Sequence, residues 1–330
     1  MNKFKYILGT IFLVLIVWFI GSKPETPNYS NQFPVVITDL IALDDSVSKA
    51  ELSNPAIKIN NQARIIWVDS TKTKTEWSIV YLHGFTASQM EGDPVHKDIA
   101  AKFGMNLYLA RLSDHGLASD SALVKMTPER LWETSKVALA IGEALGNKVI
   151  LMSTSTGGTL ALKLAEMYPD KVEALINYSP NIKINDTMAP MMNNHWGLNI
   201  LNLVFKNGYV DNSATSDSLV TQYWTTIYKT EALTELEELV ETTMTEDVFS
   251  KVKCPSLTLA YFKDEERQDP TVKVSAMRWM NETLGTDVSK KRLVEMPTVG
   301  VHPMASSIRS KDIEAVELET IKFIKEVLEL

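Results

Sequence analysis

Short apolar runs alternate with longer amphipathic segments along most of the chain. Runs typical of buried strands lie at residues 64–68, 77–82, 106–110, 148–152, 174–178, 256–262 and 291–296. Segments with helical spacing lie at residues 39–52, 96–103, 128–145, 156–168, 274–284 and 313–328. Continuously apolar strands that alternate with helices predict an α/β fold, with a mostly parallel sheet covered by helices on both faces.

The alternation stops between residues 183 and 250, where the spacing is helical. We therefore expect a core at 35–182 and 251–330, with a helical lid at 183–250 over the carboxyl edge of the sheet, where open α/β sheets bind ligands. The methionine and aromatic side chains of the lid would line an apolar pocket or pack the lid onto the core. The acidic run at 231–241 would face solvent. The methionine and aromatic residues are Met188, Met191, Met192, Trp196, Tyr223, Trp224 and Tyr228.

The N-terminal segment has its own pattern. Residues 6–22 carry no charge, whereas Lys3 and Lys5 precede them and Lys23 follows. As a helix this run spans about 25 Å, slightly less than a bilayer core of about 30 Å. We predict a membrane anchor at 1–22, with the body exported because the basic residues come first. A cleaved export signal and a buried helix are the alternatives. The polar, Pro- and Asn-containing stretch at 23–34 predicts a linker.

Composition narrows the classes of function. The chain has 330 residues, of which 45% are hydrophobic, enough for a large core. Its net charge is −8 and it has no Lys/Arg-rich run, which argues against nucleic acid as a partner. The single cysteine, Cys254, can form neither an intrachain disulfide nor a metal site by itself. Because GxGxxG, phosphate-loop and spaced His/Cys motifs are missing, we expect no nucleotide cofactor and no metal.

A serine stands where a strand is predicted to turn into a helix. The apolar run at 148–152 leads to Ser153, Thr154, Ser155, Thr156 and Gly157, and a helical segment follows. A sharp turn of this kind lifts the hydroxyl of Ser155 clear of the sheet edge, and small residues are needed two positions before and after it. The pattern predicts that Ser155 is a nucleophile.

Two backbone N–H groups are candidates for stabilising an oxyanion. The N–H of Thr156 lies at a predicted helix N-terminus, where the helix dipole favours negative charge. The strand at 77–82 is followed by His83, Gly84 and Phe85, and the Phe85 N–H would be the second donor. His83 is expected to be a structural hydrogen-bonding residue.

Acyl transfer by a serine also needs a base and an acid, which follow the nucleophile in this order: serine, acid, histidine. Of the five histidines, only His302 follows the last predicted strand, so we predict that it is the base. The loop at 263–270 offers four carboxylates for the acid. Asp269, with a turn and a helix after it, is the preferred acid, and Asp264 is the alternative because it comes directly off the strand.

These motifs resemble those of the α/β-hydrolase superfamily, from about residue 64 to the C-terminus. The chain looks most like the monoglyceride-lipase and serine-aminopeptidase-like branch, which has a helical lid. The resemblance implies a triad of Ser155, Asp269 and His302, with oxyanion donors Phe85 and Thr156. The departures are Ser153 in the place of a glycine and the extended acidic loop. The matching motifs are Leu82-His83-Gly84-Phe85, Asp114-His115-Gly116, Ser153-Thr154-Ser155-Thr156-Gly157-Gly158 and Val301-His302.

The resemblance implies a serine hydrolase that cleaves small to medium, partly apolar carboxylic esters through an acyl-enzyme. The expected partner is a small-molecule ester, and the expected location of the body is periplasmic or extracellular. Two alternatives stay open. One is peptidase, amidase or other chemistry on the same triad, and the other is a non-catalytic envelope binding protein on this scaffold.

Overall fold

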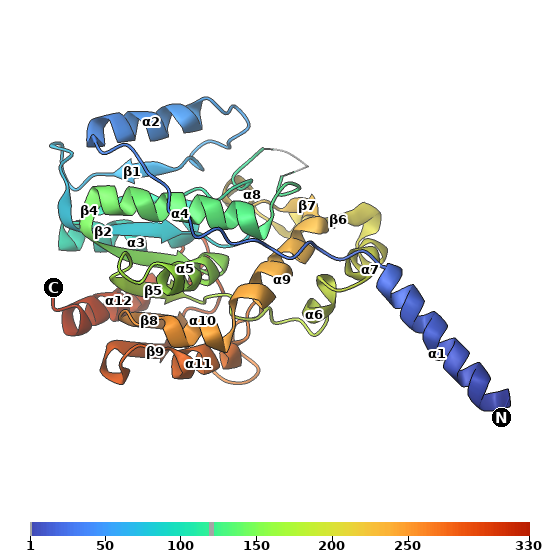
Figure 1. The fold of residues 1–330 in the computed structure, drawn as a ribbon. Helices are drawn as coiled ribbons and strands as arrows, with labels where there is room; N and C mark the ends of the chain where they lie inside the picture. The colour runs from blue at the N-terminus through green and yellow to red at the C-terminus, as the bar shows by residue number, and fades with distance from the viewer. Residues whose placement is uncertain (1, 119–121) are drawn as a thin grey trace.

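A seven-stranded sheet lies at the centre of the structure, a computed structural model that describes residues 2–118 and 122–330 (Figure 1). The strand order is β1-β3-β2-β4-β5-β8-β9, and every neighbouring pair is parallel except β1 with β3. The predicted α/β fold is confirmed, and each predicted strand is present. The strands are β1 (Arg64–Ile66), β2 (Thr75–Leu82), β3 (Asn106–Leu109), β4 (Gly146–Thr154), β5 (Ala174–Tyr178), β8 (Ser256–Ala260) and β9 (Lys291–Glu295).

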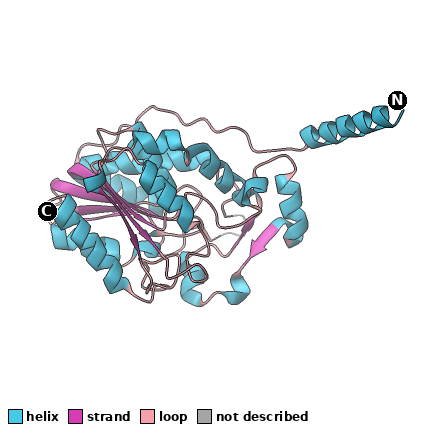
Figure 2. Cartoon of the chain, turned by 90° about the horizontal axis from the view of Figure 1, so that it is seen from below, coloured by secondary structure: helices cyan, strands magenta, loops and turns pink. Residues whose placement is uncertain are grey.

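Helices cover both faces of this sheet (Figure 2). One face packs against α4, α5 and α11, and the other packs against α3 and α12. The central strands are buried on both sides because successive side chains alternate between the faces: Val80 belongs to the first core, whereas Ile79 and Tyr81 belong to the second. The helices are α2 (Leu40–Leu52), α3 (Val95–Phe103), α4 (Pro128–Leu145), α5 (Thr156–Met167), α11 (Val274–Thr283) and α12 (Ile313–Val327).

Between β5 and β8 the chain forms a mainly helical insertion, residues 183–250. It also contains a two-stranded antiparallel ribbon, β6 (Tyr209–Asp211) with β7 (Ile227–Lys229), which the helical expectation did not include. Each of these strands has only 3 residues, too few to show a period of two in the sequence. The helices of this region are α6 (Ala189–Met192), α7 (Gly197–Val204), α8 (Ser218–Tyr223), α9 (Glu231–Thr243) and α10 (Glu246–Lys251).

The acidic helix α9 was expected to face solvent, but one of its faces is buried. Leu236, Leu239 and Val240 recur at helical spacing among its acidic residues, and they are buried in the core that contains α4 and α5. Even Glu237 is only 2% exposed. One face of α9 therefore attaches the insertion to the core.

The predicted membrane anchor is wrong. The N-terminal segment forms α1 (Asn2–Ile20), which projects away from the rest of the chain (Figure 1, Figure 2). Among the residues that the structure describes, however, no helix has the length and apolar character needed to cross a membrane. The uncharged part of α1 begins only after Lys5, so it spans about 22 Å against a bilayer core of about 30 Å. The two predictions that depended on such a helix, a membrane anchor at 1–22 and an exported body held by it, are therefore withdrawn.

The stretch predicted as a linker forms neither helix nor strand, but it packs closely on the body. The carbonyl oxygen of Ser30 accepts hydrogen bonds from Trp132 Nε1 at 2.8 Å and Lys136 Nζ at 3.1 Å, and Lys136 is only 1% exposed. Tyr29 bonds through its hydroxyl to Thr242 Oγ1 of α9 at 2.6 Å. The segment therefore connects the insertion to helix α4 of the core.

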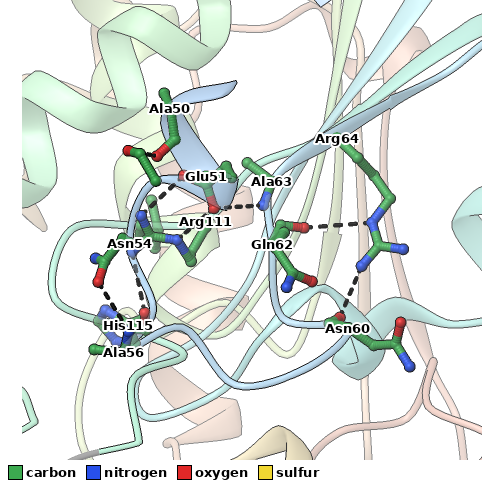
Figure 3. Close-up of polar contacts among 12 residues, drawn as sticks. Ala50, Glu51, Asn54, Ala56, Asn60, Gln62, Ala63, Arg64, Arg111 and His115 are labelled. Carbon is green, nitrogen blue, oxygen red and sulfur yellow. Dashed lines mark hydrogen bonds and ion pairs between the residues drawn. The ribbon is translucent and has the colours of Figure 1, made fainter. Parts of the chain in front are cut away.

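A largely buried ion pair braces the loop after β3. Arg111 makes two hydrogen bonds to the carboxylate of Glu51, from Nε at 2.7 Å and from Nη2 at 2.9 Å, and a third to the carbonyl oxygen of His115 at 3.2 Å (Figure 3). The Ala63 N–H donates to the same carboxylate at 2.9 Å. This arrangement ties α2 and the start of β1 to the loop at the carboxyl edge of the sheet.

Replacing Glu51 with glutamine should lower the free energy of unfolding by about 2–4 kcal/mol, because it leaves the Arg111 charge buried without a counter-charge. Urea denaturation of the full chain would measure the loss. Glu76→Gln is the matched control, since Glu76 faces Lys148 at 3.8 Å with both side chains well exposed, and such pairs contribute at most about 1 kcal/mol. Equal losses in the two variants would contradict the bracing role of the Glu51–Arg111 pair.

Candidate active site

Ser155 occupies a sharp turn between β4 and α5. Its backbone has φ 53° and ψ −120°, a conformation that costs a non-glycine residue about 1–3 kcal/mol. A Cβ atom at Gly157 would lie 1.9 Å from the carbonyl oxygen of Leu82, so only glycine fits two positions after the serine. Two positions before it, Ser153 replaces the usual glycine and donates a hydrogen bond from Oγ to Asn177 Oδ1 at 2.7 Å.

His302 and Asp269 meet at the carboxyl edge of the sheet. His302 Nδ1 lies 2.7 Å from Asp269 Oδ2. The other oxygen, Asp269 Oδ1, accepts hydrogen bonds from the N–H groups of Thr271 at 2.9 Å and Val272 at 3.1 Å. The ring nitrogen His302 Nε2 is buried and has no hydrogen-bond partner among the described residues. This nitrogen is therefore available to exchange a proton with a neighbouring group.

The pKa values of this pair shift in opposite directions. Burial alone would raise the pKa of Asp269, but attraction to His302 and hydrogen bonds from His302 and Thr271 lower it overall. Burial alone would lower the pKa of His302, but Asp269 and then Glu91 raise it above its ordinary value. Asp269 therefore stays ionised and favours a proton on the imidazole.

The structure separates the two candidate acids. Asp269 is fully buried, at 0% exposure, whereas Asp264 lies on the surface and forms an ion pair with Arg267. The pKa of Asp264 is lowered mainly by that hydrogen bond from Arg267. Of the two, only Asp269 contacts His302.

The loop after β2, residues 83–86, which we call the β2 loop, brings Phe85 close to Ser155. Gly84 packs against Ser155, and its carbonyl oxygen lies 2.9 Å from His83 Nδ1. The Leu112 N–H donates to His83 Nε2 at 3.1 Å, so His83 carries its proton on Nδ1 and donates it to Gly84. His83 thus has the structural role expected of it. Neither the Phe85 N–H nor the Thr156 N–H has an acceptor among the described residues.

A cavity of about 670 Å³ joins these groups. Ser155, Thr156, His302 and Phe85 line it, and the insertion supplies many of the other lining residues. Of the methionine and aromatic residues singled out in the insertion, Met192, Trp224 and Tyr228 line the cavity, whereas the others lie elsewhere. Trp196, for example, donates from Nε1 to the carbonyl oxygens of Val17 and Trp18 in α1.

Sequence reasoning did not single out Glu91, a buried carboxylate of this cavity. It lies in a short 3₁₀ turn (Gln89–Gly92), is 2% exposed and lines the cavity with Ser155 and His302. Its Oε2 accepts a hydrogen bond from the Gly84 N–H at 2.5 Å. No local pattern marks this glutamate in the sequence, because its surroundings come from segments far along the chain.

Comparisons with known proteins agree with the fold. The family model for serine aminopeptidases of the S33 group matches residues 133–259. No curated protein sequence matches the chain. A structure reported for the metagenome-derived lipolytic enzymes LipS and LipT superposes with a TM-score of 0.64 at 15% identity, covering 82% of this chain and 99% of that one.

Two further structures have the same fold. A monoglyceride lipase from Saccharomyces cerevisiae has a TM-score of 0.58 at 12% identity, covering 81% of this chain and 91% of its own. The protein Est1E from Butyrivibrio proteoclasticus has a TM-score of 0.54 at 18% identity, covering 81% of this chain and 94% of its own. The parallel sheet, the serine turn and these likenesses show that the chain has the α/β-hydrolase fold, and the match between residues 133 and 259 makes it similar to the serine-aminopeptidase and monoglyceride-lipase branch of that superfamily.

Proposed function

We propose that the chain hydrolyses carboxylic esters by a Ser–His–Asp acyl-enzyme mechanism, with Ser155 as nucleophile, His302 as base and Asp269 as the orienting acid. The observation that carries the proposal is the 2.7 Å contact between His302 Nδ1 and Asp269 Oδ2, in the cavity that Ser155 also lines. A buried carboxylate on one ring nitrogen leaves the other nitrogen free to act on a serine hydroxyl.

In the acylation step, His302 Nε2 takes the proton of Ser155 Oγ while that oxygen attacks the ester carbonyl carbon. The carbonyl oxygen becomes an oxyanion, which the N–H groups of Phe85 and Thr156 stabilise. The imidazolium is held by Asp269 and then protonates the leaving alcohol. Water then gives a proton to His302 and attacks the acyl carbon, the bond to Ser155 Oγ breaks, the carboxylic acid leaves, and His302 returns the proton to Ser155.

The cavity favours esters with a partly apolar portion. The insertion places Met192, Trp224 and Tyr228 on its wall, and burying an apolar chain against such side chains contributes about 0.8 kcal/mol per methylene. The similar structures include a monoglyceride lipase and a metagenome-derived lipolytic enzyme. We infer that the insertion acts as a lid over an acyl group of small to medium length.

Hydrolysis of a p-nitrophenyl ester series, from acetate to palmitate, by the full chain tests this proposal. Turnover should be highest for acyl chains of small to medium length and should disappear in Ser155→Ala. A well-folded chain without turnover on any member of the series, and without labelling by a serine-directed fluorophosphonate, would contradict the proposal.

A second candidate is peptide or amide hydrolysis on the same residues, which the match to serine aminopeptidases favours. Amino-acid p-nitroanilides measured beside the matching p-nitrophenyl esters would separate the two. A larger kcat/KM on the anilides would replace the ester assignment and keep the roles of Ser155, His302 and Asp269.

The pH profile follows from the state of the base. His302 accepts a proton only when neutral, and its pKa is raised because Asp269 and Glu91 outweigh the effect of burial. As the pH falls through that value, the imidazolium accumulates and kcat/KM declines. We expect the acidic limb of the kcat/KM profile to have its midpoint above the ordinary histidine value of about 6.5. A midpoint well below that value would contradict the arrangement around His302.

A further inference from the structure

The carboxyl group of Glu91 lies beside the proposed nucleophile. Gly84 separates the two: a Cβ atom placed on Gly84 would lie 2.8 Å from Ser155 Cβ, 2.9 Å from Glu91 Oε2 and 3.1 Å from Glu91 Oε1. Both carboxyl oxygens therefore face the β2 loop, on the same side as the serine. Glu91 is almost fully buried there, at 2% exposure, and burying an ionisable group is costly unless neighbouring groups compensate.

A hydrogen bond holds this carboxyl group to the β2 loop, because its Oε2 accepts from the Gly84 N–H at 2.5 Å. The insertion meets the same loop through its backbone, since the Thr225 N–H donates to the carbonyl oxygen of Thr86 at 2.8 Å. Trp224, the residue before Thr225, lines the cavity together with Glu91. The loop that carries Phe85 therefore lies between Glu91 and the insertion.

We propose that Glu91 is a positioning residue for the hydrolysis: its carboxyl group holds Gly84, and so keeps the Phe85 N–H directed at the substrate carbonyl. The inference rests on the proposed function. Gly84 is held on both sides, since its carbonyl oxygen accepts from His83 Nδ1 and its N–H donates to Glu91. The Gly84 carbonyl and the Phe85 N–H share one peptide plane, so a rotation at Gly84 misdirects the donor. An oxyanion donor acts only from a narrow range of positions.

Glu91 also places a second titrating group near the base. Burial raises the pKa of Glu91 to about 7, although His302 and the hydrogen bond from Gly84 act in the opposite direction. Tyr81 of β2 also faces Glu91, but burial raises the pKa of its hydroxyl well above the usual range, so it stays neutral. His302 has Asp269 on its other side. Removing the Glu91 charge should therefore lower the pKa of His302.

Two variants of the full chain test the proposal, with Glu266→Gln as the matched control because Glu266 is exposed on the loop that precedes Asp269. Glu91→Ala leaves the Gly84 N–H without its acceptor and should lower kcat/KM roughly 10- to 100-fold. Glu91→Gln keeps an acceptor oxygen, so its loss should stay within roughly fivefold. Its acidic limb should move to lower pH by roughly half a unit to one unit, because the attraction to the imidazolium is gone.

For the wild type and each variant, ester turnover is measured from about pH 5 to pH 9. The rate of fluorophosphonate labelling of Ser155 and the thermal unfolding curve are measured on the same proteins. Variants that match the wild type in both rates and in the acidic limb would overturn the role of Glu91 while leaving the proposed function intact. Equal losses in Glu91→Gln and Glu91→Ala with an unmoved acidic limb would assign Glu91 to stability alone. A folded wild type that neither turns over nor labels would overturn the proposed function, and this inference with it.

Discussion

Replacing Ser155 with alanine is expected to lower kcat for ester hydrolysis by roughly 10⁴- to 10⁶-fold, because no other group at the turn can form the acyl-enzyme. The residual rate would come from the oxyanion donors and from substrate binding alone. The fold should persist, because the backbone hydrogen bond from Ser155 N–H to the Tyr178 carbonyl oxygen, at 3.1 Å, does not involve the hydroxyl. An ester-hydrolysis assay at high protein concentration would measure the residual kcat of the variant.

Ser153→Ala is the matched control for this prediction. Ser153 is two residues away on β4 and is fully buried, and its hydroxyl donates to Asn177 and does not line the cavity. Its loss should cost about 1 kcal/mol of stability and change kcat by less than roughly tenfold. Comparable activity losses in the two variants would mean that the turn responds to any substitution, and Ser155 would lose its assignment as nucleophile.

Replacing Asp269 with asparagine is expected to lower kcat by roughly 10³- to 10⁴-fold. The N–H groups of Thr271 and Val272 both donate to Asp269 Oδ1, so the amide oxygen of an asparagine would stay there. Its NH₂ group would then face His302 Nδ1, where Oδ2 now lies at 2.7 Å. A donor at that position forces the proton of His302 onto Nε2, and the imidazole can no longer accept the proton of Ser155.

Asp264→Asn is the control, on the same loop. Asp264 is 39% exposed in its side chain and pairs with Arg267, an interaction worth at most about 1 kcal/mol. We expect kcat to remain close to that of the wild type and the acidic limb to stay in place. A large loss in Asp264→Asn with little change in Asp269→Asn would reverse the assignment of the acid.

The choice between Asp264 and Asp269 could not be made from the sequence alone. Both lie on one loop after β8, and residue spacing left both open. In the structure the loop folds back on itself: Lys263 N–H donates to the Arg267 carbonyl oxygen at 2.9 Å, which turns Asp264 outward. The Asp269 N–H then donates to the Tyr261 carbonyl oxygen, also at 2.9 Å, and returns Asp269 to the sheet edge.

Some features were predictable because they depend on local patterns. The strands of the sheet and the serine turn need only apolar periodicity, a small residue before Ser155 and glycine after it. The location of the N-terminal segment could not be settled in this way, since its charge pattern resembles that of an anchor while the uncharged part of the helix is too short. The ribbon of β6 and β7 was hidden because 3 residues per strand carry no period.

The sequence by itself determined the parallel sheet and the turn at Ser155, because each follows from neighbouring residues. Only the tertiary structure decided which carboxylates meet at the cavity. Asp269 reaches His302 from a residue separation of 33, and Glu91 comes close to Ser155 across Gly84, where a Cβ atom would meet both side chains. Contacts between distant segments depend on how helices and strands pack, and no short pattern of residues encodes them.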